Sequence, residues 1–153
     1  PLPPVAILES RTGNVAAGKV VFGQYCGICH QVNGEGINFG PALSEIGSKL
    51  GKDALYKSIL YPNSGINFGY EGYTVVLKNG DTAVGIVESK TATELILRLN
   101  GGSKRTFNMS EVASVTELPN SLMPEGLHRA MSEQELVDLV EYLADQRTPG
   151  VSK

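Results

Sequence analysis

The string Cys26-Gly27-Ile28-Cys29-His30 constrains this chain of 153 residues more than any other feature. Two cysteines are separated by two residues, and a histidine directly follows the second cysteine. This spacing is typical of covalent haem attachment, in which each thiol adds to one vinyl group of the porphyrin. The histidine then becomes an axial ligand of the iron. The motif predicts one covalent haem c, attached through Cys26 and Cys29 and ligated by His30.

Two other chemistries also use closely spaced cysteines. A structural zinc ion needs about four Cys or His ligands, and His128 is the only Cys or His residue outside the motif. A thioredoxin-like redox pair is expected to follow a strand, whereas residues 13–25 have a helix-like pattern. Both alternatives explain the motif less well than haem attachment does.

Four residues could supply the second axial ligand of the iron, namely Met109, Met123, Met131 and His128. Met123 precedes Pro124, which fixes the local backbone and removes one hydrogen-bond donor, and a helix start follows shortly afterwards. We therefore expect Met123 to be the ligand. His128 is the alternative, which would give a bis-histidine site. We expect Met109 to belong to a core and Met131 to pack beneath the last helix.

The helical part of the chain divides into several predicted elements. A helix is expected from about Asn14 to Cys26, with Asn14 as its N-cap, and a short one near Ser44. Another is expected over residues 53–61. Ser132 and Glu135 have the spacing of a capping box at the start of the last helix. These elements lie on both sides of the segment 70–118.

Within the segment 70–118 the hydrophobic period changes to two. Tyr73, Val75 and Leu77 alternate with other residues, and Asn79-Gly80 and Asn100-Gly101 are turn signals. About five short strands are expected, which indicates a small antiparallel barrel or strongly curled sheet of SH3-like or Sm-like size. An ordinary hairpin insert lying against the rest of the chain is the alternative.

These elements together predict a mainly α fold of the cytochrome c type with an inserted small antiparallel β subdomain. The helical remainder has the size and element order of a class I cytochrome c. The predicted division is a linker at 1–13, a haem domain at 14–69 and 119–147, the β insert at 70–118, and a tail at 148–153.

The stretch Gly40-Pro41-Ala42-Leu43 resembles the Gly-Pro-x-Leu sequence of class I cytochromes c. In that family the proline carbonyl accepts a hydrogen bond from the histidine that ligates the iron. The resemblance implies this role for Pro41, beside His30. The alternative is that Gly-Pro only forms a turn. The sequence Met123-Pro124, followed by a Ser-x-x-Glu helix start, is also similar to the distal side of these cytochromes.

A more specific resemblance extends from about residue 14 to residue 146. The chain is similar to the haem-binding c-type cytochrome domain at the C-terminus of bacterial membrane-bound, sorbosone or glucose dehydrogenase-like proteins. The matching stretches are 26–36, 40–43, 58–63, 69–73 and 121–127. The resemblance implies an electron carrier, not an enzyme, that accepts electrons from an attached or partner dehydrogenase and passes them to another cytochrome or an oxidase. A haem-based sensor with a weak or bis-histidine distal site is the alternative.

Composition excludes several other partners. The formal net charge is -3, so the chain lacks the basic footprint of a nucleic-acid-binding protein. No apolar run approaches the length of a membrane span. In bacteria, covalent haem attachment follows export, which predicts the periplasmic or exported side of a membrane. The chain begins at Pro1, and we expect it to be a processed or excised piece of a longer protein.

Overall fold

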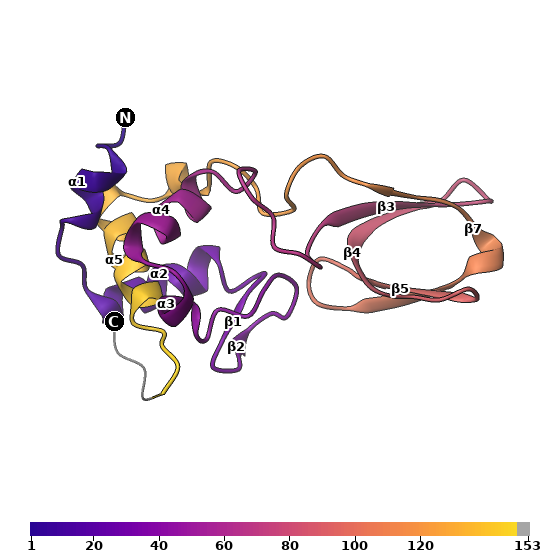
Figure 1. The fold of residues 1–153 in the computed structure, drawn as a ribbon, viewed down its shortest axis with the longest axis horizontal. Coiled ribbons are helices and arrows are strands. Elements are labelled where there is room, and N and C mark those ends of the chain that lie inside the picture. Colours follow the sequence, from indigo (N-terminus) through magenta and orange to yellow (C-terminus); the bar gives the residue numbers. More distant parts are fainter. Residues whose placement is uncertain (150–153) are drawn as a thin grey trace.

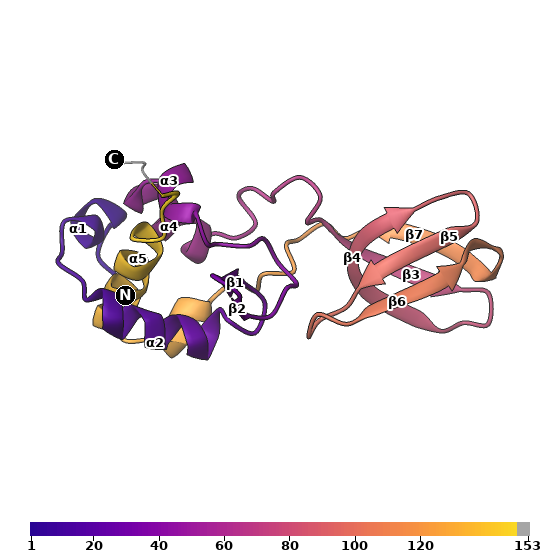
Figure 2. The same ribbon diagram turned by 90° about the horizontal axis from the view of Figure 1, so that it is seen from below.

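The computed structural model of the protein describes residues 1–149. Figure 1 shows the helices gathered at one end of an elongated molecule and a β-sheet at the other, and Figure 2 shows the same division from below. We call residues 1–71 and 118–149 the helical region and residues 72–117 the sheet region. Of the tail predicted at 148–153, residues 150–153 lie outside the described residues.

Five α-helices and a 3-10 helix form the helical region. They are α1 (Val5–Glu9), α2 (Val15–Tyr25), α3 (Ile46–Lys49), α4 (Lys52–Leu60), the 3-10 helix η2 (Leu127–Ala130) and α5 (Glu133–Ala144). The predicted helix starts are confirmed: the Asn14 side chain caps α2 at the Ala17 amide, 2.8 Å away, and Ser132 and Glu135 form a capping box on α5. Within residues 1–149, no helix is long and apolar enough to cross a membrane.

Residues 1–13, predicted as a linker, contain α1. The side chain of Leu8 is fully buried on this helix. Its carbonyl oxygen accepts a hydrogen bond from the hydroxyl of Tyr56 on α4, at 3.3 Å. This N-terminal stretch therefore packs into the helical region.

The first hydrophobic core lies between α2 and α5, which contact each other closely. The rings of Phe22 on α2 and Tyr142 on α5 have centroids 5.6 Å apart. At the start of α2, the Asn14 amide donates to an oxygen of Asp138 at 2.8 Å. The two helices come from opposite ends of the chain. Their packing therefore joins the N-terminal and C-terminal parts of the helical region.

The sheet region contains five antiparallel strands in the order β6-β5-β4-β3-β7. They are β3 (Gly72–Leu77), β4 (Thr82–Lys90), β5 (Glu94–Arg98), β6 (Lys104–Asn108) and β7 (Val112–Glu117), with the 3-10 helix η1 (Met109–Glu111) before β7. All five strands predicted from the sequence are confirmed. One face of the sheet carries a second hydrophobic core, built from Val75, Leu77, Leu95, Leu97 and Phe107. A separate short hairpin, β1 (Gln31–Val32) and β2 (Glu35–Gly36), follows the cysteine motif.

The predicted fold class, a mainly α cytochrome with a small β insert, is wrong. Helix accounts for 32% of the structure and strand for 23%, and the five-stranded antiparallel sheet is open. Strands β6 and β7 form its two edges, and within residues 1–149 no strand pairing joins them. The segment 70–118 forms its own core, as expected for a compact β subdomain. With 23% of the structure in strand, however, the sheet is too large a part of the fold for a mainly α class.

Candidate haem site

The cysteine motif begins where α2 ends. Cys26 is the C-cap of this helix, and its amide still donates to the Phe22 carbonyl at 2.8 Å. The Cys26 carbonyl then accepts from the amides of Cys29 and His30 at 3.0 and 2.9 Å. The chain therefore turns tightly within the motif, and both cysteines and the histidine line one cavity.

The imidazole of His30 packs against Gly40 and is hydrogen-bonded to Pro41. Its Nδ1 lies 2.7 Å from the Pro41 carbonyl oxygen. Because a carbonyl can only accept, Nδ1 carries the proton and the lone pair of Nε2 is left for a metal. At Gly40, an added Cβ would lie 2.7 Å from Cε1 of the ring, so only glycine permits this close approach. Burial lowers the pKa of His30, while the bond to Pro41 acts in the opposite direction.

The two cysteines are free thiols in this structure. Burial raises the pKa of Cys26 to about 12, and the neighbouring Cys29 contributes in the same direction. Burial also raises the pKa of Cys29. Both sulfurs therefore carry their protons, the form in which an S–H bond can add across a vinyl group.

Met123 lies in the loop before η2, and this loop is held by Asn63. The Met123 amide donates to the Ser121 hydroxyl at 3.1 Å. The Asn63 side chain accepts from the Ser121 amide at 2.7 Å and donates to Glu125 at 2.6 Å. One amide side chain therefore holds residues on both sides of the methionine.

A cavity of about 680 Å³ brings these groups together. Cys26, Cys29, His30, Pro41 and Met123 all line it. Its other lining residues are mainly apolar and include Phe39, Leu43, Ile46, Leu55, Ile59 and Leu143. The volume lies within the range of about 300–1,000 Å³ that is usual for cofactor sites. A haem c needs two thiols for attachment and two iron ligands, for which an imidazole and a thioether are suitable. The apolar cavity supplies all four, so these residues fit that group.

The other candidate ligands lie elsewhere. His128 lines a different cavity, beside Leu2 and Tyr61, and among the described residues its Nδ1 is buried without a hydrogen-bond partner. Met131 packs against the helical core, and Met109 packs against the sheet core. The structure therefore brings Met123, and not these three, to the cavity that His30 lines.

Sequence reasoning missed two residues that shape the site. Asn63 entered the sequence analysis only as the last residue of the matching stretch 58–63. Arg98 was not singled out within the predicted β segment 70–118, although its guanidinium reaches the loop beside His30. The available signal was an arginine alternating with leucines, which places a charge on the opposite face of a strand.

Residues 15–81 match the family model of cytochrome c. This match covers less than half of the 153 residues, including the cysteine motif but neither Met123 nor α5. A comparison with curated proteins found no match. The family match supports a c-type cytochrome, a class of electron-transfer module that carries haem c and exchanges electrons with redox partners.

Proposed function

We propose that this chain is an electron carrier with one covalent haem c, attached through Cys26 and Cys29 and ligated by His30 and Met123. The observation that carries the proposal is the single cavity lined by all four residues. When bound there, haem c supplies reversible one-electron exchange at its iron. If His30 and Met123 both ligated the iron, no coordination position would remain open for a substrate, which favours a carrier over an enzyme or a gas sensor.

The chain's own residues have distinct roles in this function. His30 donates its Nδ1 proton to Pro41, which fixes the ring and directs the Nε2 lone pair toward the metal. Met123 offers a soft thioether, which favours the reduced metal. The apolar lining excludes water, and this stabilises the less charged state of the site. All three features favour a reduction potential on the positive side.

For its partners, we propose a dehydrogenase domain as electron donor, attached or separate, and another cytochrome or an oxidase as acceptor. This rests on the resemblance of residues 26–36 and 121–127 to the cytochrome domains of bacterial dehydrogenase-like proteins. We propose the periplasmic or exported side of a bacterial membrane as its location, because bacteria attach haem c after export. The proposed division into a haem domain at 14–69 and 119–147 with an insert at 70–118 agrees with the two separate cores.

Acid–acetone extraction of the purified protein tests the haem assignment. The pigment should stay with the polypeptide, and its mass should exceed the sequence mass by one haem. Electrochemical titration should then show a single reversible one-electron wave. Extraction of the pigment into the solvent, or a mass without haem, would show that the central proposal is wrong.

A further inference from the structure

Two buried apolar residues belong to neither hydrophobic core. Phe39 is 6% exposed and Ile86 is 3% exposed, yet both are outside the two clusters formed by the described residues. Phe39 lies in the loop after the cysteine motif, and Ile86 lies on β4 in the sheet region. Both line the haem cavity. The sheet region therefore contributes directly to the site.

The alternation of β4 explains how it does so. Ala83 and Val87 pack against the core of the sheet. Because successive side chains on a strand point to opposite faces, Val84 and Ile86 lie on the other face. Val84 also lines the haem cavity and is 47% exposed. The outer face of the sheet thus presents apolar side chains to the cavity.

One row of residues across this outer face reaches both sides of the cavity. Gly72 on β3 pairs with Ile86 on β4, and Ile86 pairs with Arg98 on β5. At Gly72, an added Cβ would lie 2.8 Å from Cγ of Leu122, the neighbour of Met123. At the other end of the row, Arg98 reaches the loop that contains Phe39. The row therefore runs from the methionine loop to the histidine loop.

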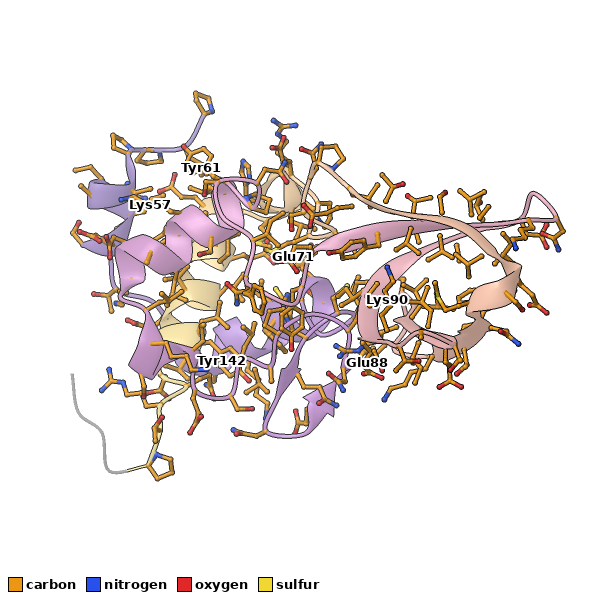
Figure 3. The ribbon with its side chains drawn as sticks, turned by 45° about the vertical axis from the view of Figure 1, so that its right-hand side comes forward. Lys57, Tyr61, Glu71, Glu88, Lys90 and Tyr142 are labelled. Atoms are coloured by element: carbon orange, nitrogen blue, oxygen red, sulfur yellow. The ribbon has the colours of Figure 1, made fainter. Side chains whose placement is uncertain are left out.

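Arg98 fixes the histidine side of this row. Its Nη1 donates to the Phe39 carbonyl at 2.8 Å, while Nε and Nη2 donate to Glu88 at 3.1 and 3.0 Å. The Arg98 side chain is only 12% exposed. Its guanidinium also lies over the ring of Tyr70, 5.9 Å from the centroid. Phe39 directly precedes the Gly40-Pro41 segment that holds His30. Figure 3 shows Glu88 where the sheet approaches the helical region.

We propose that the outer face of the sheet is a wall of the haem site, formed by Val84 and Ile86 and locked to the histidine loop by Arg98. This inference rests on the proposed function. The wall excludes water from one side of the cavity and thereby contributes to the reduction potential. Arg98 is a positioning residue, since it acts on His30 through Phe39 and the segment that follows it.

Val84→Asp tests the wall, because this half-exposed position tolerates substitution better than Ile86. The matched control is Ile96→Asp, on the same outer face of the sheet but outside the cavity lining. A carboxylate in the wall favours the oxidised site, so Val84→Asp should lower the reduction potential of the covalently loaded protein more than Ile96→Asp does. Equal shifts, or none, in two folded variants would overturn the wall.

Ile86→Ala provides a second variant that adds no charge. By opening the wall to water, it should also lower the potential, and an unchanged potential would count against the proposal. Mass spectrometry of the wild type and of each variant shows whether haem is attached, and so distinguishes failure of the proposed function from failure of the wall. A wild type without covalent haem overturns the proposed function, whereas a loaded protein with unresponsive Val84 and Ile86 variants overturns only the wall.

Arg98→Lys tests the contact between Arg98 and the histidine loop. Lysine keeps the charge but lacks the guanidinium group, which donates to Glu88 and Phe39 at the same time. The Gly40 amide donates to the Cys29 carbonyl at 2.6 Å. Its hydrogen exchange should accelerate about tenfold or more, as expected for the loss of one charge-assisted hydrogen bond. Arg105→Lys is the control, since Arg105 stacks on Phe107 within the sheet region. Unchanged exchange at Gly40 in Arg98→Lys would remove Arg98 from its proposed role.

Discussion

The two hydrophobic cores differ in whether they are complete. The sheet core is closed by its own side chains, with Val75, Leu95 and Leu97 fully buried. The helical core opens onto a cavity of about 680 Å³ with mainly apolar walls. Apolar surface facing water costs free energy that burial would recover. We therefore expect the helical region to depend on bound haem for stability, and the sheet region to be stable without it.

The largest expected effect comes from removing both thiols. Cys26→Ser with Cys29→Ser should abolish covalent haem entirely. The cavity then stays open, so amides of α2 and α5 should lose most of their protection from hydrogen exchange, while those of β3 to β5 keep theirs. Exchange mass spectrometry measures both regions in one sample. Uniform loss of protection in both regions would show that the sheet also depends on haem.

Removing Met123, the proposed second iron ligand, should have the next largest effect. Met123→Ala should abolish the methionine-to-iron charge-transfer band of the oxidised protein and lower the reduction potential, since a soft ligand is lost. Covalent attachment should remain, because both thiols are untouched. His128→Ala is the control, since His128 lines the other cavity. The reverse pattern in these two variants would establish bis-histidine ligation.

The sequence allowed different features of the two regions to be predicted. The motif at 26–30, the caps at Asn14 and Ser132 and the five strands depend on local patterns, and local physics decides them. The candidate roles of His30, Pro41 and Met123 could be proposed because a five-residue motif and two proline contexts mark them. Alternation predicted the strands of the sheet region, but it did not predict the fold class, because strands make up 23% of the structure, too large a share for a mainly α fold.

The contacts between the regions were beyond sequence reasoning for another reason. Arg98 and Phe39 are 59 residues apart in sequence, and Asn63 reaches Ser121 across 58 residues. Such contacts depend on how a strand face or a loop is finally placed, and no local spacing encodes that placement. The alternation of Arg98 with leucines could reveal its face, but not its partner.

Replacing the sheet region should alter the haem site less than losing Met123 does. With residues 70–118 exchanged for a short Gly/Ser linker, covalent haem and ligation by His30 should be preserved because α2 and α5 still pack together. The histidine loop should loosen, since Phe39 loses its hydrogen bond from Arg98. The Met123 loop should loosen, since it loses the contact of Leu122 with Gly72. The charge-transfer band should weaken and the potential should fall. A protein that no longer folds or takes up haem would show that the sheet is part of a single common core.

Asn63→Ala should loosen the same loop to a smaller extent. The substitution removes two hydrogen bonds, to Ser121 and Glu125, worth about 1–2 kcal/mol together. We expect a weaker charge-transfer band and faster loss of this band on heating, with the sheet region unaffected. Ser10→Ala is a suitable control, because the Ser10 hydroxyl makes a local bond, to the Ile7 carbonyl at 2.7 Å, and Ser10 is not among the residues that line the cavity. Equal behaviour of the two variants would show that Asn63 does not hold the loop.

The smallest expected effect concerns the charge cluster of Glu88, Arg98 and Lys104, where the sheet approaches the helical region. Glu88 pairs with Lys104 at 2.8 Å and with Arg98 at 3.0 Å, and hydrogen bonding to Lys104 and then to Arg98 lowers its pKa from the ordinary value of 4.5. A carboxylate with a lowered pKa stabilises the folded state above its unfolded pKa, and this contribution is lost as the pH falls through the folded value. Glu88→Gln should therefore destabilise the sheet region by about 0.5 kcal/mol at pH 7.

This difference between wild type and Glu88→Gln should shrink as the pH falls through about 4.5, the ordinary pKa of glutamate, where half of the unfolded-state carboxylates are protonated. Hydrogen exchange of β4 and β5 amides at several pH values measures it, with the exposed Glu94→Gln as a control. Because Glu88 holds only one side of the Arg98 guanidinium, the bond from Arg98 to Phe39 should survive, and the reduction potential should move little. A change at the haem site as large as that in Arg98→Lys would mean that the whole cluster, and not Arg98 alone, joins the two regions.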